Sequence, residues 1–413
     1  MVTSLCGSGN NFTGIVTTGV ANHVIADDNN FTNVLTTGFG NSVVGKHNDF
    51  THLITTGVDN TADAQGNTFT NVVTTGFDNY AGAWNNNFSN FVTTGKYNNV
   101  HASENDFSHF FTTGIDNETG AHANSFSNVF NSGIGNVGNV SDNSFSIFGV
   151  NGLHNNLTAN DNHFSNVITS GIANTTGAYG NSFTHVIPTG IGNVTNASEN
   201  NFTNVLTAGL GNVVDADGNN FTHVITAGKD NHVTTAAWCA DAGNTFANIV
   251  TAGIGNTTGA SGNNVSDIFN TGLSNHVTAQ DNDFTNAITT GIANVTSTKH
   301  KDFTNDVNTG IRNSSTTVAN GFTDNFTTGI ANRSVVKNNT LGVNLAPGVN
   351  NVAKLQNSVA SLSEAMGANS HSSVKDSVLS IAFAKGADNN VSTRGTFGGV
   401  AHALGVGQND SAP

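Results

Sequence analysis

A nineteen-residue phrase repeats along most of the chain. Residues 29–41 read NNFTNVLTTGFGN, and the phrase returns nineteen residues later as NDFTHLITTGVDN and then as NTFTNVVTTGFDN. Numbering each unit from its phenylalanine, as position 1, gives 18 units, with six extra residues in the twelfth. A period of this length indicates a repeat architecture in which each unit is completed only by its neighbours.

The most constrained positions of the unit are 1, 5, 7, 9, 11, 13 and 15, which are all odd. A period of two is typical of β-strands with one face in and one face out, whereas a helix would show apolar residues at 3.6 spacing. We therefore predict strands over positions 1–7 and 9–15 and a turn over 16–19. The predicted fold is all-β, a β-solenoid (β-helix) of about 18 coils in which each coil bonds to the next.

Two positions never vary among the 18 units. Position 8 is always Gly and position 11 is always Asn, which suits a corner that needs positive φ and a stack of amide side chains. With the phenylalanines placed inward as core anchors, these residues form a predicted structural ladder. Its first members are Gly19, Gly38, Gly57, Asn22, Asn41, Asn60, Asn79, Asn98, Phe31, Phe50 and Phe69.

If odd positions point inward, positions 2, 4 and 6 form the outward surface. Position 2 is Thr or Ser in 16 of 18 units, position 4 is mainly apolar, and position 6 is Thr in 12 units. The expected interaction face is therefore a Thr–Val–Thr lattice. Its candidate residues are Thr32, Val34, Thr36, Thr51, Thr55, Thr70, Val72, Thr74, Phe91 and Phe110. The opposite register would put the phenylalanine column outside.

The pattern breaks in two places. The extra residues of the twelfth unit, near 234–241, carry Trp238 on a predicted surface loop that is a candidate contact point. From about residue 352 the period fails, and Val352, Leu355, Val359, Leu362 and Met366 have helical spacing. We predict a solenoid domain over 1–351 and a cap of one helix and short strands over 352–413.

Sites of chemistry are not evident in the sequence. The 15 His residues scatter along the repeat, so we expect no metal, and neither a nucleophile elbow nor a phosphate loop occurs. We therefore predict no enzyme and no cofactor. The net charge of −15 disfavours nucleic acid, and no apolar run is long enough to span a membrane.

Two families resemble the repeat. FNSGIGNVGN (130–139) and FNTGLSN (269–275) resemble the Asn- and Gly-rich tandem repeats of mycobacterial PPE proteins, although the Pro-Pro-Glu domain of that family is absent. The order strand, Gly-x-Gly-Asn, strand is similar to the curlin repeat of functional amyloid, with Thr and Asn where curlin has Gln. Both resemblances cover the repeat region only and imply an extracellular structural solenoid.

Three functions fit these features. The first is a non-enzymatic surface, matrix or filament protein that self-associates laterally or end to end, because an exposed apolar stripe usually marks an interface. The second is ice binding through ordered Thr residues, and the third is binding to a polysaccharide. We expect an extracellular or cell-surface location even though the opening MVTSLCGSGN contains no secretory signal, and a cytoplasmic location stays open.

Overall fold

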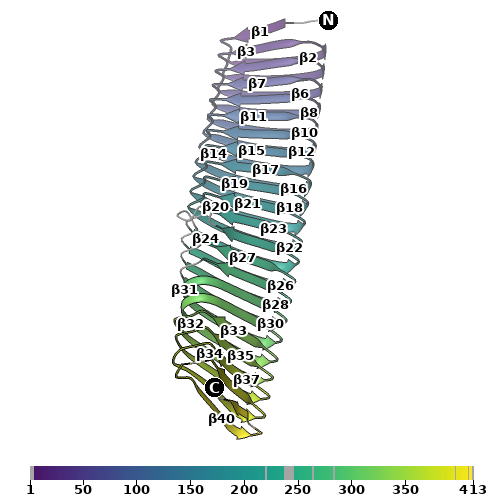
Figure 1. The fold of residues 1–413 in the computed structure, drawn as a ribbon. Coiled ribbons are helices and arrows are strands. Elements are labelled where there is room, and N and C mark those ends of the chain that lie inside the picture. The colour runs from purple at the N-terminus through teal and green to yellow at the C-terminus, as the bar shows by residue number, and fades with distance from the viewer. Residues whose placement is uncertain are drawn as a thin grey trace. The chain divides into compact units, whose positions relative to one another are not determined.

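Parallel β-strands make up the described part of the chain, and no helix occurs there. The structure is a computed structural model that describes residues 4–218, 221–236, 246–262, 265–281, 284–395, 397–407 and 409–411. It divides into two compact units, Met1–Asn204 and Val205–Pro413. Within each unit the strands lie side by side in coil order (Figure 1). The predicted β-solenoid is confirmed.

Unit 1 contains two parallel sheets. The long-strand sheet is formed by nine-residue strands that cover positions 1–9: β2 (Phe12–Val20), β4 (Phe31–Phe39), β6 (Phe50–Val58), β8 (Phe69–Phe77), β10 (Phe88–Lys96), β12 (Phe107–Ile115), β14 (Phe126–Ile134), β16 (Phe145–Leu153), β18 (Phe164–Ile172) and β20 (Phe183–Ile191). The short-strand sheet is formed by five-residue strands: β1 (Ser4–Ser8), β3 (His23–Asp27), β5 (Ser42–Lys46), β7 (Thr61–Gln65), β9 (Tyr80–Trp84), β11 (Asn99–Ser103), β13 (Glu118–His122), β15 (Val137–Ser141), β17 (Asn156–Asn160), β19 (Thr175–Tyr179) and β21 (Val194–Ser198).

Unit 2 repeats this arrangement, and β22 (Phe202–Leu210) crosses the boundary between the units. Its long strands are β24 (Phe221–Lys229), β26 (Phe246–Ile254), β28 (Val265–Leu273), β30 (Phe284–Ile292), β34 (Leu341–Val349), β36 (Ala360–Ala368), β38 (Ser380–Ala387) and β40 (Val400–Val406). Its short strands are β23 (Val213–Asp217), β25 (His232–Ala236), β27 (Thr257–Ser261), β29 (His276–Gln280), β33 (Arg333–Lys337), β35 (Val352–Gln356), β37 (His371–Lys375), β39 (Asn390–Arg394) and β41 (Asn409–Ser411). The strands β31 (Val295–Ile311) and β32 (Ser314–Ile330) run through both sheets.

The register keeps like residues on top of one another. Phe31 pairs with Phe50 and Gly38 pairs with Gly57, an offset of one repeat. In unit 2 Phe221 pairs with Phe246, so the stack absorbs the six extra residues of the twelfth unit without losing register. That insertion lies mostly in residues 237–245, outside the described part of the chain.

The glycine at position 8 is required by a backbone contact between coils. Gly38 has φ +133°, and a Cβ built on it would overlap the carbonyl oxygen of Gly19. The same overlap arises at Gly57 against Gly38. Only glycine can adopt this φ with a neighbouring backbone so close, which explains why position 8 does not vary.

Buried asparagines form a ladder at each corner of the coil. At position 11, the backbone N–H of Asn22 and its Nδ2 both donate to Oδ1 of Asn41, at 3.0 and 2.9 Å. The backbone N–H of Asn41 in turn donates to Asn60, and the ladder continues through Asn79 to Asn98. A second ladder runs at position 18, where the N–H of Asn48 donates to Oδ1 of Asn67 at 2.9 Å. The predicted Asn ladder is confirmed, and the structure adds the second one.

The prediction that the odd positions of both strands point inward is half wrong. Positions 11, 13 and 15 are buried as expected, for example Asn41, Val43 and Gly45. In the long strands, however, positions 2, 4 and 6 are buried and Phe31 is 40% exposed. The glycine kink at position 8 and the left-handed residue at position 10, such as Gly40 with φ +65°, turn the backbone at the corner. As a result the inward-facing positions are even before the corner and odd after it. Phe31, Phe50 and Phe69 therefore form a ladder on the surface and are not core anchors.

The predicted helix over 352–366 is also wrong. This segment forms β35 and the first part of β36, which pair with β33 and β34. The helical spacing misleads because the preceding coil offers a row of unpaired backbone groups that a strand can satisfy. The sequence carries a signal for this continuation, since Gly367, Gly386 and Gly405 follow Gly348 at intervals of nineteen. The solenoid thus continues past 351 to β41, and no helix caps it in the described residues.

We predict that Gly38→Ala lowers the free energy of unfolding by more than about 3 kcal/mol, because the added methyl meets backbone and cannot be avoided by a side-chain movement. The matched control is Gly40→Ala. Gly40 also has positive φ, but nothing lies within 4 Å of a Cβ placed on it, so we expect a loss of about 1 kcal/mol. Denaturant unfolding of both variants checks this, and equal losses would contradict the role assigned to the contact between coils.

Candidate functional site

The two sheets present very different surfaces to solvent. The long-strand face consists of the outward residues at positions 1, 3, 5, 7 and 9. In β4 its apolar members Phe31, Leu35 and Phe39 are 40%, 37% and 51% exposed. Most described coils repeat apolar residues at these three positions, with exceptions such as Lys96 and Gly149. Three apolar rows therefore run across the strands of the long-strand sheet.

The first row of the long-strand face is an aromatic stack. The ring centroids of Phe31 and Phe50 are 4.9 Å apart with an interplanar angle of 5°, and the series continues through Phe69, Phe88, Phe107 and Phe126 at 4.9–5.0 Å. Because the rings cover one another's faces, the stack presents ring edges to solvent. The row is regular and fixed in position by its own contacts.

A polar row at position 3 separates two of the apolar rows. Its side chains bond along the row, as when Nδ2 of Asn90 donates to Oδ1 of Asn71 at 2.9 Å. In unit 2, Asn305 donates to Asn286 at 3.0 Å, and Asn286 donates to Asp267 at 2.8 Å. These hydrogen bonds lower the free-energy cost of covering the row with an apolar partner, because some donors and acceptors of the row are already hydrogen-bonded to one another.

In unit 2 a groove follows this polar row. Its lining includes Asn248, Asp267 and Asn286 at position 3 together with Val250, Phe269, Ile288 and Val307 at position 5. One side of the groove is therefore polar and the other apolar. The long-strand face is thus ridged, with the larger residues standing above the rows of Asn and Thr.

The short-strand face, formed by the outward residues at positions 12, 14 and 16, lacks this repetition. Its position 12 changes from coil to coil, with His23, Ser42, Thr61, Tyr80 and Asn99 in the first five coils. Most of its residues are polar and no apolar row extends across it in the described coils. The long-strand face is therefore the surface where repetition and apolar exposure coincide.

The predicted Thr–Val–Thr interaction face is wrong, because its residues point into the protein. The buried residues are Thr32, Val34, Thr36, Thr51, Thr55, Thr70, Val72, Thr74, Phe91 and Phe110, each at most 2% exposed. The remaining candidate, Trp238, lies outside the described residues.

Hydrogen bonding explains why hydroxyl groups occupy position 2, in the interior. Oγ1 of Thr51 donates to Oδ1 of Asn67 in the position 18 ladder at 3.2 Å, and Thr32 does the same to Asn48. At position 6 the hydroxyl of Thr112 lies 2.7 Å from that of Thr119, across the interior. The recurrence of Thr or Ser at position 2 together with Asn at position 18 was a signal for this inward orientation.

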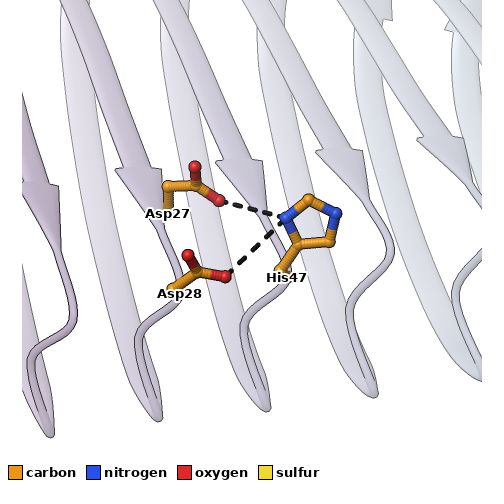
Figure 2. A group of neighbouring side chains, drawn as sticks. All are labelled: Asp27, Asp28 and His47. Atoms are coloured by element: carbon orange, nitrogen blue, oxygen red, sulfur yellow. Dashed lines mark hydrogen bonds and ion pairs between the residues drawn. The ribbon is translucent and has the colours of Figure 1, made fainter.

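One trio of titratable side chains has ligand atoms within 4.8 Å of one another in the described residues. Figure 2 shows Asp27, Asp28 and His47, with Nδ1 of His47 lying 3.2 Å from Asp27 and 3.8 Å from Asp28. All three side chains are at least 40% exposed. The carboxylates pair with the imidazole in solvent, and three exposed side chains of this kind do not by themselves define a metal centre.

Two other carboxyl groups stand out by burial. Burial raises the pKa of Asp63 above its usual value, and the nearby Lys46 partly offsets the effect. Asp306 is 1% exposed, and its Oδ2 accepts hydrogen bonds from Thr298 and Ser315 at 3.2 and 3.4 Å and from Thr317. Asp306 is thus held by hydroxyl groups in the interior and is not presented to a substrate.

Comparison with known proteins gives no assignment, since no protein family, curated protein or solved structure matches the chain. The resemblances to PPE and curlin repeats therefore stay predictions. None of the described residues belongs to a helix long and apolar enough to cross a membrane.

Neighbouring threonines provide a direct test of the orientation. Thr55 is buried at position 6, whereas Thr56 at position 7 is partly exposed on the long-strand face. We predict that Thr55→Lys costs more than about 3 kcal/mol in unfolding free energy, because it buries an unpaired charge. Thr56→Lys should change it by less than about 1 kcal/mol. Thermal or denaturant unfolding measures both losses, and a larger loss for Thr56→Lys than for Thr55→Lys would contradict the observed orientation of the long strand.

Proposed function

We propose that the protein is a non-enzymatic structural solenoid whose copies associate laterally through their long-strand faces. The observation that carries this proposal is the set of apolar rows at positions 1, 5 and 9, which recur from coil to coil on one sheet and are absent from the short-strand face in the described coils. Contiguous apolar patches of this kind on soluble proteins usually mark an interface.

The size of the face supports a stable contact. Unit 1 has ten long strands of nine residues, which at ~4.8 Å between strands and ~3.3 Å per residue correspond to about 1,400 Å². A standard interface buries about 800 Å² on each partner. Covering half of the long-strand face of unit 1 would therefore bury nearly the area that a standard interface buries on each partner.

A second copy is a suitable partner because the surface is complementary to itself. Ridges at positions 1, 5 and 9 alternate with lower rows of Asn and Thr at positions 3 and 7. Two such sheets can face each other about 10 Å apart with ridges of one entering the low rows of the other, as paired sheets do in steric zippers. The setting we propose is extracellular, and this part rests on the resemblance to surface and secreted repeats.

The other two functions have less support. Ice binding was predicted from the Thr–Val–Thr lattice, whose residues are buried. Polysaccharides commonly stack on aromatic faces, but Phe50, Phe69, Phe88 and Phe107 cover one another's faces. No observation on the described surface favours either function over self-association.

We predict that the triple variant Leu35→Lys, Val92→Lys and Phe130→Lys weakens self-association by at least about a hundredfold, because three charges would have to be desolvated in the contact. These residues are 37%, 38% and 47% exposed, so the coil should still fold. Sedimentation velocity and electron microscopy measure the change.

The matched control places three lysines on the short-strand face of the same unit, as Ser42→Lys, Asn99→Lys and Asn139→Lys. It adds the same charge and should associate like the unmodified protein. A monomeric unmodified protein, or equal loss of association in both triple variants, would contradict the proposal. Circular dichroism of each variant verifies that the strands are retained.

A further inference from the structure

Histidine interrupts the polar row of the long-strand face in unit 1. Position 3 is His in three coils of this unit and Asn in most of the others. The three imidazoles are exposed, and each lies between the apolar rows at positions 1 and 5. They are His52 on β6, His109 on β12 and His185 on β20. These titratable groups therefore lie inside the surface through which we propose that copies associate.

Each of these histidines meets an asparagine amide of the coil that follows it. The amide Nδ2 lies 3.0–3.4 Å from a ring nitrogen in all three pairs, which are Asn71 with His52, Asn128 with His109 and Asn204 with His185. The same pair forms in unit 2, where Asn248 lies 3.1 Å from His223. An amide nitrogen can only donate, so the ring nitrogen that it meets must accept. The arrangement therefore requires neutral imidazole.

The hydrogen bonds of the position 3 row all run from one coil to the coil before it. Nδ2 of Asn90 donates to Oδ1 of Asn71, and Nδ2 of Asn71 donates to Nε2 of His52. The bond from Asn90 fixes the orientation of the Asn71 amide. A protonated imidazole carries hydrogen on both ring nitrogens and would direct an N–H group at the amide N–H of the following coil. Protonation therefore breaks the row at each histidine.

The surroundings of the three histidines contain no carboxylate. On the two strands beside each of them, the outward residues at positions 1, 3 and 5 are Phe, Asn, Val, Leu or Ile. Among the described long strands of unit 1, the charged residue of the outer face is Lys96. It lies at position 9, about 20 Å along the strand direction from position 3. A protonated imidazole on this face therefore has no anion beside it.

We propose that two copies whose unit 1 long-strand faces meet stay associated only while His52, His109 and His185 are neutral, so that acidification separates them. This inference rests on the proposed self-association and adds its regulation. In that contact an apolar ridge of the second copy covers the position 3 row. A protonated imidazole would lose its water there and gain no anion. The carboxylates of the described long-strand face lie in unit 2, at Asp267, Asp324 and Glu364.

Association should weaken as the pH falls. Histidine takes up a proton between about pH 8 and pH 5. Separated copies can bind that proton, whereas associated copies must exclude it, so association is favoured above this range and lost as the pH falls through it. Each covered histidine can weaken association by up to about tenfold per pH unit. The fold of one copy is affected less, because the exposed imidazoles keep their water.

The net charge of the chain has the opposite effect. It is −15 with neutral histidines, so copies repel one another. Protonation of histidines anywhere on the surface reduces this repulsion. Acidification would therefore strengthen association if the histidines at position 3 had no special role, and the sign of the pH effect distinguishes the two cases.

Sedimentation velocity of the unmodified protein at about pH 7.5 and about pH 5.5 tests the inference. We expect the dissociation constant to rise by at least about a hundredfold at the lower pH, since the contact covers these histidines of both copies. An unchanged or lower dissociation constant overturns the inference and leaves the proposed self-association intact. A protein that is monomeric at both pH values overturns both. Loss of strands at the lower pH, measured by circular dichroism, would also overturn the inference, because the effect would then lie in the fold.

A triple variant assigns the effect to the histidines of the long-strand face. The variant His52→Asn, His109→Asn, His185→Asn should associate like the unmodified protein at about pH 7.5, because Asn occupies position 3 in neighbouring coils. It should remain associated at about pH 5.5.

The matched control removes three histidines from the short-strand face of the same unit, as His23→Asn, His101→Asn and His122→Asn. They occupy positions 12, 14 and 16, away from the proposed contact. This variant should separate on acidification as the unmodified protein does. Equal pH dependence of the two triple variants overturns the inference.

Discussion

Successive coils approach so closely at position 8 that no side-chain atom fits between their backbones, and the rest of the coil depends on this approach. A Cβ on Gly57 would overlap the carbonyl oxygen of Gly38. The contact requires the same backbone at the same place in every coil. Three residues further on, the asparagine ladder uses this repetition, because each amide reaches the backbone N–H of the coil before it.

The same glycine decides which side chains reach the surface. The turn over positions 8 to 11 shifts which positions face inward, so that positions 2, 4 and 6 of the long strands and positions 11, 13 and 15 of the short-strand side line the interior. The interior thus receives Thr, Val, Ala and Asn, and the hydroxyl groups at position 2 bond to the asparagine ladder at position 18. Phe31 and its successors stack outside, and the apolar long-strand face follows from the geometry of the corner.

The repeat length, the strand period and the invariant corner residues could be predicted because each is forced by backbone geometry. The orientation of the long strands could not be predicted from periodicity, since a period of two does not identify which side is inside. A large aromatic such as Phe50 suggested a core, but stacking on identical rings stabilises it at the surface. The pairing of Thr51 with Asn67 was the better guide, because a hydroxyl that serves a buried ladder must point inward.

The functional account follows from the difference between the two outer faces. The conformation of the coil requires Gly and Asn at its corners, but it does not require apolar residues at positions 5 and 9, and the short-strand face shows that polar residues are tolerated outside. We infer that the long-strand face is retained for contact with another copy. The most direct test is a cryo-electron microscopy structure of the assembled protein. The account predicts long-strand sheets of neighbouring copies facing each other about 10 Å apart. An assembly joined through its short-strand faces, with the phenylalanine row in solvent, would contradict it.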